Sequence, residues 1–445
     1  MTQSVGETLT GLVRVRQAAK QNPTQRFDNL LKHITPELLR QAYFALNAKA
    51  AEGIDDVSWE VYGEELDTHI PDLCTRVHTN RYKPKPVKRI WIPKANGQQR
   101  PIGITAIEDK VVQQAVVWVL EAIYEVDFLG FSYGFRPGRS QHHALDAVYM
   151  AITTRKVSWV LDADIKGFFD TIQHDWMMRF LKHRIADPRL LRIVERTLKC
   201  GVVDEGRKTR SEAGTPQGAV LSPLLANIYL HYVLDLWVRQ WRHRHSRGAM
   251  YAVRYADDSL YCFQFMDDGK RFHRALEQRL NKFGLSLNSG KTRLVEFGRF
   301  AKSNRHERGL VKPGTFDFLG FTHFCSVRWS TGDFALRRIT IAKRQREKIA
   351  AIKKWLMHNR HLPVFEIGQW LKKVITGYLN YFAVPGNLVA MVAFRTEVCK
   401  AWLKALRRRS QKGGSLPWYK YQKLVKVFIP KVRVVHPYPV YRFGG

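Results

Sequence analysis

The sequence contains little cysteine and no long apolar run. Its 445 residues include five cysteines, Cys74, Cys200, Cys262, Cys325 and Cys399. They are widely spaced and form no C-x-x-C pair, which argues against a zinc knuckle or a disulfide framework and favours a reducing compartment. No stretch approaches the roughly 20 apolar residues of a membrane span, and residues 1–10 lack the basic start and apolar core of a signal peptide. We therefore expect a cytoplasmic protein without a membrane partner.

Acidic residues are also scarce. There are 73 Lys and Arg residues against 39 Asp and Glu residues, which gives a formal net charge of +34. So large an excess repels itself in an isolated globule and is neutralised beside a polyanion. Nucleic acid is therefore the expected partner, and acidic proteins or membranes are the alternative. The chain length and the 45% hydrophobic content predict two or three domains.

Two adjacent aspartates, Asp257 and Asp258, interrupt an apolar ribbon. Residues 251–253 and 260–263 are rich in aromatic and β-branched residues, so they predict two short strands with the aspartates at the hairpin turn. Unpaired carboxylates this close repel each other and are costly to bury. A divalent cation such as Mg²⁺, which prefers hard oxygen ligands, would remove that cost. The alternative is an ordinary Asp-Asp turn.

A second acidic cluster ends a predicted buried strand that begins at residue 157. It contains Asp162, Asp164 and Asp170. The end of a strand is a rigid position from which to present a metal ligand. If this strand and the aspartate hairpin belong to one sheet, Asp164 converges with Asp257 and Asp258. Three carboxylates are enough to hold two Mg²⁺ ions for in-line phosphoryl transfer.

Residues 90–104 predict a β-hairpin with cations beside its turn. An Asn-Gly pair between apolar runs is a strong hairpin signal, and Lys94 and Arg100 flank that pair. Two cations in this position can hold a triphosphate. The preceding basic, proline-rich run, residues 81–89, is equally compatible with phosphate contact and with a solvated linker.

The remaining chain combines helices with glycine-rich loops. We expect residues 1–25 to be frayed. Residues 131–140 form a glycine-rich aromatic loop, and the loop at 214–218 allows the backbone to approach a ligand closely. Beyond about residue 337, basic amphipathic helices follow, whose charged faces we expect to bind nucleic acid rather than solvent alone. The tail from residue 413 mixes lysines with aromatic residues, a composition suited to RNA contact.

Several motifs resemble, in order, those of bacterial group II intron reverse transcriptases/maturases. They are Arg-Pro-Ile-Gly-Ile at 100–104, Gly-Phe-Arg-Pro-Gly at 134–138, Asp-Ile-Lys-Gly-Phe-Phe-Asp at 164–170, Gly-Thr-Pro-Gln-Gly at 214–218, Tyr-Ala-Asp-Asp at 255–258, Lys291, and Phe-Leu-Gly at 318–320. The resemblance runs from about residue 27 to the end of the chain. One motif alone would be weak evidence, whereas this ordered set is very specific.

The resemblance implies an α+β fold, a right-hand polymerase whose fingers and palm contain antiparallel sheet, followed by a helical thumb. It divides the chain into a helical, RNA-binding N-terminal extension (1–80), reverse transcriptase fingers and palm (81–330), a helical thumb/maturase domain (331–412) and a basic C-terminal tail (413–445).

The resemblance also implies RNA-directed DNA polymerase activity. Asp164, Asp257 and Asp258 would be the catalytic residues that hold two Mg²⁺ ions, with Asp258 the less direct ligand. The pocket for the dNTP would contain Lys94, Arg100, Ile165, Phe169, Gln217 and Lys291. Phe169 matches the position at which a bulky ring excludes a ribose 2′-hydroxyl, and core packing is the alternative for Phe168 and Phe169. Asp162 and Asp170 are expected to be structural.

The implied partners are group II intron RNA, an RNA template with a DNA primer, dNTPs and a DNA target. The tail lacks cysteine pairs, so we expect a form without the endonuclease domain, primed from DNA at a replication fork. Two alternatives are a splicing-only maturase with a vestigial polymerase site and a reverse transcriptase used in phage defence or CRISPR adaptation. The intact acidic triad disfavours the first, and the lack of a visible fused domain disfavours the second.

Overall fold

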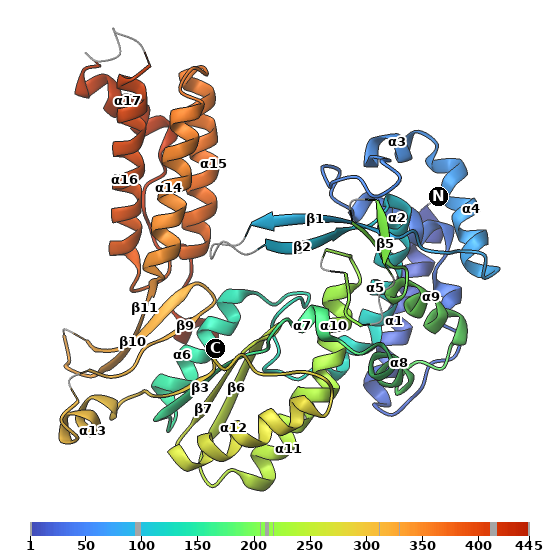
Figure 1. Ribbon diagram of the computed structural model, residues 1–445, viewed down its shortest axis with the longest axis horizontal. Coiled ribbons are helices and arrows are strands. Elements are labelled where there is room, and N and C mark those ends of the chain that lie inside the picture. Colours follow the sequence, from blue (N-terminus) through green and yellow to red (C-terminus); the bar gives the residue numbers. More distant parts are fainter. Residues whose placement is uncertain are drawn as a thin grey trace.

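The computed structural model describes residues 2–93, 99–204, 206–209, 213–216, 218–310, 312–328, 330–409 and 416–443. Helices and three small sheets alternate along this chain, and a tower of long helices stands beside a hairpin-bearing body (Figure 1). This mixed architecture confirms the predicted α+β fold. In the described ranges, no helix combines the length and apolarity that crossing a bilayer requires.

The central sheet has the strand order β6-β7-β3-β8, and every neighbouring pair is antiparallel. Its strands are β3 (Trp159–Asp164), β6 (Met250–Tyr255), β7 (Asp258–Phe263) and β8 (Arg293–Glu296). Because side chains alternate along a strand, the sheet has two apolar faces. Leu161 and Phe263 belong to one core, on the side of α12 (Met266–Asn281), and Val160 and Leu260 belong to another, on the side of α6 (Gln141–Thr154).

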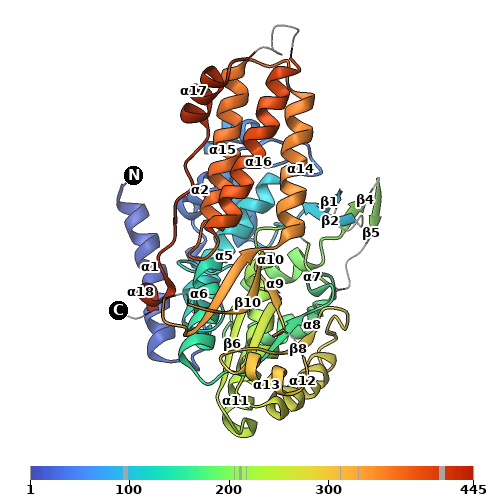
Figure 2. The same ribbon diagram turned by 90° about the vertical axis from the view of Figure 1, so that its left-hand side faces the viewer.

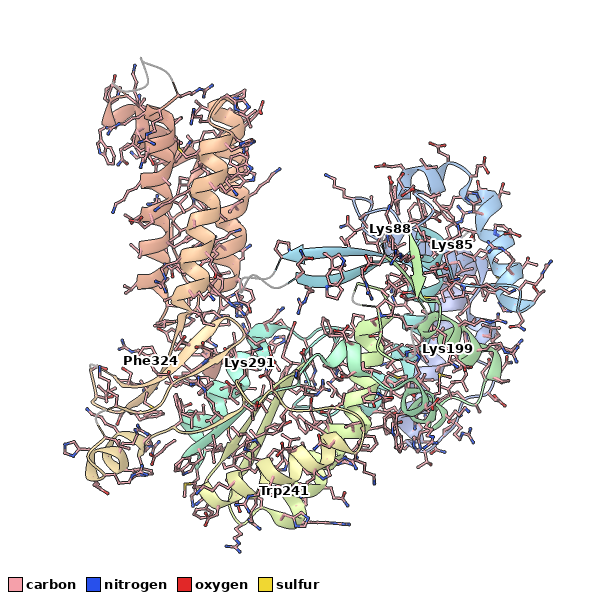
Figure 3. All side chains as sticks on the ribbon, viewed as in Figure 1. Lys85, Lys88, Lys199, Trp241, Lys291 and Phe324 are labelled. Atoms are coloured by element: carbon pink, nitrogen blue, oxygen red, sulfur yellow. The ribbon has the colours of Figure 1, made fainter. Side chains whose placement is uncertain are left out.

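A second sheet, with the order β2-β1-β4-β5, forms the predicted basic hairpin region. It contains β1 (Val87–Pro93), β2 (Gln99–Ile104), β4 (Val202–Asp204) and β5 (Arg207–Thr209). Strands β1 and β2 pair with Ile92 opposite Arg100, which confirms the hairpin, whereas its turn at 94–98 lies outside the described residues. At the base of the hairpin, Lys85 and Lys88 are paired with Asp55 and Asp56 at 2.9 and 2.7 Å (Figure 3).

The N-terminal helices share one hydrophobic core with the central sheet. They are α1 (Thr2–Gln21), η1 (Leu31–His33), α2 (Pro36–Ala45), α3 (Trp59–Glu64), α4 (Leu66–His78) and α5 (Ile107–Asp127). The expectation of a frayed segment at 1–25 is wrong, because Val15 and Ala19 lie one turn apart on α1 and are buried where it packs on α5. The carboxylate of Asp187 ties this region to the next by accepting the backbone N–H groups of Leu30 and Leu31 at 2.9 Å.

Shorter helices connect this core to the central sheet. They are α7 (Phe168–Thr171), α8 (His174–Lys182), α9 (Pro188–Leu198), α10 (Ser222–Leu230), the π-helix η2 (His231–Asp235) and α11 (Leu236–His245). Helix α13 (Ala301–Glu307) follows β8 and lies on the other side of the molecule, below β10 (Phe321–Val327) (Figure 1). Helix α10, η2 and α11 run without interruption, so the π-turn lies inside one long helix. π-Turns of this kind are rare and often occur at functional sites.

The helical tower has a core of its own. The strands β9 (Phe316–Phe318), β10 (Phe321–Val327) and β11 (Phe334–Thr340) lead into α14 (Ala342–His358), α15 (Val364–Phe382), α16 (Leu388–Arg407) and α17 (Trp418–Phe428). Trp402 and Phe428 are buried in this core, so α17 belongs to the tower although its sequence lies in the predicted tail. The chain then returns to the sheet, where α18 (Pro439–Phe443) lies beside α6 (Figure 2).

Candidate active site

Three aspartates gather at one end of the central sheet. Strands β3 and β7 pair with Asp164 directly opposite Asp258, and directly opposite residues have Cβ atoms about 4.5–5.5 Å apart. Tyr255 pairs with Asp258, so Ala256 and Asp257 form the two-residue turn between β6 and β7. The structure thus brings together the three carboxylates that the sequence analysis singled out.

The turn is held in an uncommon backbone conformation. Ala256 has a φ of 56°, a left-handed value that non-glycine residues rarely adopt and that the surroundings must enforce. The loop at 131–140 packs directly on it, since a Cβ atom on Gly134 would clash with the backbone nitrogen of Ala256. Backbone bonds secure the loop, because Tyr133 N donates to Arg254 O and Arg254 N donates to Phe131 O, both at 2.8 Å.

Arg254 fixes the same turn from inside the core. Its guanidinium is fully buried and forms a two-pronged ion pair with Asp235, with N–O distances of 2.7 and 2.6 Å. It also donates to Ala256 O at 3.0 Å, Asn227 Oδ1 at 3.1 Å and Ser132 Oγ at 2.7 Å. Arg254 therefore connects the carbonyl of the turn, the π-helix and the glycine-rich loop. Sequence reasoning missed this role, and the signal was a lone charge in an otherwise apolar strand.

Lys291 lies against the carboxylate of Asp164. Its Nζ atom is 2.9 Å from Asp164 Oδ2, and the amide of Asn288 donates to the same oxygen at 3.0 Å. Asn288 N also donates to Asp164 O at 2.8 Å, which fixes the loop that carries Lys291 to the end of β3. This contact with Asp164 raises the pKa of Lys291. Figure 3 shows Lys291 at the centre of the molecule, close to the central sheet. Asn288 is a second residue that sequence reasoning missed.

The aspartates are electrostatically crowded. Desolvation, followed by the negative charges of Asp257 and Asp164, raises the pKa of Asp258 to about 6. Desolvation, followed by the charge of Asp164, also raises the pKa of Asp257. Asp162 lies on the same face of β3 as Asp164, and its pKa is raised to about 7, again mainly by desolvation. Such a group of carboxylates favours a bound cation.

These side chains suit a hard divalent cation, because every candidate ligand is a carboxylate oxygen at the same end of the central sheet. In the ranges that the structure describes, no three His, Cys, Asp or Glu side chains are already arranged as a metal site. Asp164 is instead neutralised by Lys291. A cation bound at this end of the sheet would therefore compete with Lys291 for the carboxylate of Asp164.

The two phenylalanines after β3 have different surroundings. Phe168 is buried in the core, as expected for one member of the pair. Phe169 is half-buried, and its ring meets the exposed ring of Phe135 edge-on at 6.5 Å between centroids. Phe135 comes from the glycine-rich loop and also approaches Tyr255, at 6.4 Å. Ile165 is buried in the same core as Phe168 and forms a β-bridge with Leu287.

Thr215 and Gly218 lie between residue 169 and the basic hairpin. Thr215 N donates to Phe169 O at 2.8 Å, and a Cβ atom on Gly218 would lie 2.7 Å from Gly103 O of β2. Arg100 is exposed on the same strand. Lys94 and Gln217 lie outside the described residues, so their places in the site stay predictions.

Comparisons with known proteins match the chain to one family and to several relatives. Residues 92–323 match the family described as "Reverse transcriptase (RNA-dependent DNA polymerase)". The chain is 37% identical over 257 residues to "Protein YkfC" of Escherichia coli (strain K12), which covers 53% of this chain and 67% of that protein. It is 34% identical over 245 residues to "Group II intron-encoded protein LtrA" of Lactococcus lactis subsp. cremoris, which covers 54% of this chain and 40% of LtrA.

A more distant relative is "Nuclear intron maturase 4, mitochondrial" of Arabidopsis thaliana, 24% identical over 212 residues. That match covers 46% of this chain and 25% of the relative. The chain therefore spans two thirds of the length of YkfC but less than half of the length of either intron protein.

Proposed function

The chain belongs to the reverse transcriptase family of RNA-dependent DNA polymerases, and from this premise we propose that it copies RNA into DNA and also binds group II intron RNA to assist splicing and mobility. The observation that carries the proposal is the placement of Asp164 opposite Asp258 across β3 and β7, with Asp257 in the adjoining turn. The names of LtrA and of the intron maturase support the intron RNA as a partner.

We assign Asp164, Asp257 and Asp258 as the residues that would hold two Mg²⁺ ions, with Asp258 the less direct ligand. The metal, when bound, would acidify the primer 3′-hydroxyl and offset charge on the triphosphate. The carboxylate oxygens at the same end of the central sheet support this assignment. Arg254 is a positioning residue, because it holds the carbonyl of the turn that carries Asp257.

The nucleotide pocket would be formed by residues of the basic hairpin, the end of β3 and two loops. They are Lys94, Arg100, Ile165, Phe169, Gln217 and Lys291. Lys291 and Arg100 would bind phosphate oxygens. Lys291 would leave the carboxylate of Asp164 and bind the triphosphate instead. Phe169 would pack where a ribose 2′-hydroxyl lies and so select deoxynucleotides. Its edge contact with Phe135 supports a fixed ring at that position.

The substrates and partners would be an RNA template with a DNA primer, dNTPs, intron RNA and a DNA target, in the cytoplasm. Intron RNA would contact the N-terminal extension (1–80), the thumb (331–412) and the basic tail (413–445), with fingers and palm at 81–330. The net charge of +34 supports a polyanionic partner of this size.

Primer extension on an RNA template with dNTPs and Mg²⁺ tests the polymerase. We compare the wild type with Asp257→Asn, which removes one negative charge, and with Asp175→Asn, an exposed aspartate of α8. Extension by the wild type and Asp175→Asn, with a loss of about 1,000-fold or more in Asp257→Asn, is expected. Absence of extension by all three proteins, together with tight and specific binding of intron RNA, would favour the splicing-only maturase.

A further inference from the structure

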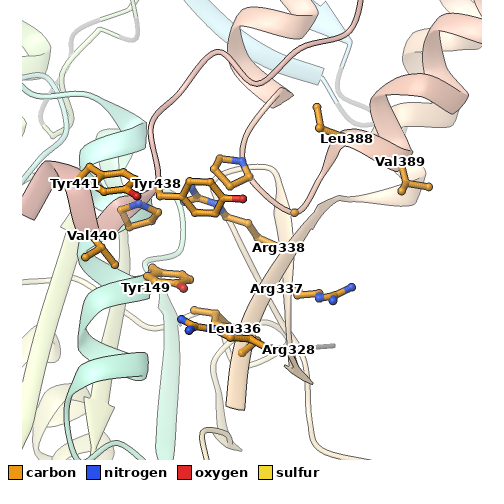
Figure 4. Close-up of a pocket in the computed structure, with 14 residues that line it drawn as sticks. Tyr149, Arg328, Leu336, Arg337, Arg338, Leu388, Val389, Tyr438, Val440 and Tyr441 are labelled. Atoms are coloured by element: carbon orange, nitrogen blue, oxygen red, sulfur yellow. The ribbon is translucent and has the colours of Figure 1, made fainter. Parts of the chain in front are cut away.

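A cavity of about 730 Å³ lies at the base of the helical tower, away from the aspartates. Helix α6, strand β11, the N-terminus of α16 and helix α18 enclose it (Figure 4). Its lining includes Tyr149, Arg328, Arg337, Leu388, Tyr438 and Tyr441. No aspartate of the active site and no described residue of the predicted nucleotide pocket lines this cavity. Its size is that of sites that take small organic molecules or single nucleotides.

The charge of the cavity is positive. Arg328 and Arg337 line it, and in the described part of the chain neither guanidinium has an ion-pair or hydrogen-bond partner. The cavity lining contains no Asp or Glu. A guanidinium is planar and weakly hydrated and pairs well with phosphate oxygens. Two unpartnered arginines on the lining of one cavity therefore favour an anionic ligand that carries phosphate.

Aromatic rings form the opposite wall. Tyr438 and Tyr441 are 57% and 80% exposed, and their rings stand edge-to-face at 6.4 Å between centroids. Tyr149 on α6 and Leu388 of α16 add further apolar surface. Exposed aromatic rings beside arginines are the means by which proteins bind unpaired bases, because every base offers a π-face to stack on. Bases inside a duplex are already stacked and cannot enter such a cavity.

The wall is held in place before any ligand binds. The buried carboxylate of Asp146 on α6 is 3.0 Å from Arg338 of β11 and 3.0 Å from Arg442 of α18. The rings of His142 and His436 stack at 3.5 Å between centroids. These contacts anchor the end of the chain to α6, so Tyr438 and Tyr441 are presented on a fixed support. A preorganised site loses less entropy when a ligand is bound.

We propose that this cavity binds unpaired nucleotides of a single-stranded nucleic acid, with bases on Tyr438 and Tyr441 and neighbouring phosphates on Arg328 and Arg337. The inference deepens the proposed function and rests on it, because intron RNA is then the expected source of the strand. A single-stranded DNA segment has the same stacking and phosphate chemistry and is the second source.

The test uses the full chain loaded with a template–primer duplex, so that the polymerase site is occupied. Binding of a fluorescein-labelled decauridylate, and of its deoxy counterpart, is measured by anisotropy. The double variant Tyr438→Ala/Tyr441→Ala is expected to bind the RNA roughly tenfold or more weakly, whereas Tyr438→Phe/Tyr441→Phe keeps the rings and stays within about twofold. Arg337→Gln is expected to weaken binding about fivefold. Arg274→Gln, an exposed arginine of α12, is the matched control and stays within about twofold.

Cross-linking gives an independent readout that does not depend on variant stability. A 5-iodouridine-substituted strand is expected to cross-link to Tyr438 or Tyr441, mapped by mass spectrometry. Tighter RNA than DNA binding assigns the intron or template RNA as the source, and equal binding extends the site to DNA strands. Unchanged affinity in the alanine variant with no cross-link in 438–441 overturns the proposal, as does self-association of the wild type that the alanine variant abolishes. Primer extension by the wild type is measured separately, so failure of the polymerase and failure of the cavity are distinguishable.

Discussion

Arg254 is a buried charge whose partners all lie around the aspartate turn. Replacing it by Met leaves Asp235 buried and unpaired, which in comparable cases costs about 3–5 kcal/mol of folding free energy. The turn also loses the donor to Ala256 O. We expect Arg254→Met to lower the free energy of unfolding by that amount in urea titrations, and to lower kcat for primer extension more than it changes KM for dNTP.

An exposed ion pair provides the control for this variant. Lys199 and Glu195 lie one helical turn apart at 2.7 Å, and both side chains are largely exposed. Lys199→Ala should therefore change the free energy of unfolding by less than about 1 kcal/mol. A loss in Arg254→Met no larger than the loss in Lys199→Ala would contradict the central role given to the buried pair.

Lys291 is expected to act on the triphosphate rather than on the fold. Lys291→Gln removes the charge but keeps a polar side chain, and we expect KM for dNTP to rise about tenfold or more with little change in thermal stability. Lys291→Arg should keep much of the affinity. Lys282→Gln, which changes an exposed lysine of the preceding segment, is the control. Steady-state kinetics of primer extension at varied dNTP concentration decides the question, and equal KM values in Lys291→Gln and Lys282→Gln would disprove it.

At the scale of single residues, the charged residues that belong to a local motif were predictable from the sequence. Residues whose role depends on a contact with a distant residue were not. Asp257 and Asp258 are conspicuous because two carboxylates interrupt an apolar ribbon. Arg254 lies three residues before Asp257, but its role depends on an ion pair with Asp235. Asp235 lies in a π-turn, which no sequence pattern predicts. Asn288 is a similar case, because its contact with Asp164 joins two distant strand ends.

Among the elements, the glycine-rich loop and the aspartate turn must fit without a side chain between them. Gly134→Ala would place a methyl group against the backbone nitrogen of Ala256, which cannot retreat as a flexible side chain can. We expect a loss of about 1–3 kcal/mol in stability and a loss of about 100-fold or more in primer extension. Thermal melting and single-turnover extension measure the two effects.

The matched control lies four residues earlier in the chain. A Cβ atom on Gly130 would meet no atom within 4 Å, so Gly130→Ala should keep nearly full activity and stability. Equal activities of the two alanine variants would show that the close approach of the loop does not position the turn.

Helix α15 offers a second comparison within one element. A Cβ atom on Gly368 would lie 2.5 Å from the ring of Phe428, whereas one on Gly377 would meet nothing within 4 Å. Gly377→Ala should stabilise the tower by up to about 1 kcal/mol, because alanine is the better helix former. Gly368→Ala should destabilise it by about 1–3 kcal/mol through overpacking. Thermal melting of both variants tests the pair, and a shift in the same direction would refute the assigned packing of α17 on α15.

Elements with a local signal were predictable from the sequence. The β1–β2 hairpin has an Asn-Gly pair between apolar runs, and the aspartate hairpin has runs rich in aromatic and β-branched residues on both sides. The strand order β6-β7-β3-β8 was not predictable, because it depends on pairing between segments about 100 residues apart. Helix α1 was missed because it is stabilised by contact with α5 rather than by its own composition.

On the scale of the whole molecule, the basic composition predicted the partner but not the arrangement of the cores. The N-terminal helices share a core with the central sheet, and the tower has a core of its own. The end of the chain leaves the tower and packs on α6 through Asp146. Long-range ion pairs of this kind connect residues that no local pattern relates.

The excess positive charge makes one prediction that belongs to the entire chain. The formal net charge is +34. If much of this charge contacts nucleic acid, binding of the nucleic acid releases counterions from many phosphates. A protein that contacts about 6–10 phosphates loses roughly 10³–10⁵ in affinity between 50 and 200 mM salt. We expect the affinity for intron RNA, measured by filter binding across this range, to fall by at least that lower factor. A decline below tenfold would mean that most of the charge serves solubility, and recognition would then rest on a few sites such as the cavity beside α18.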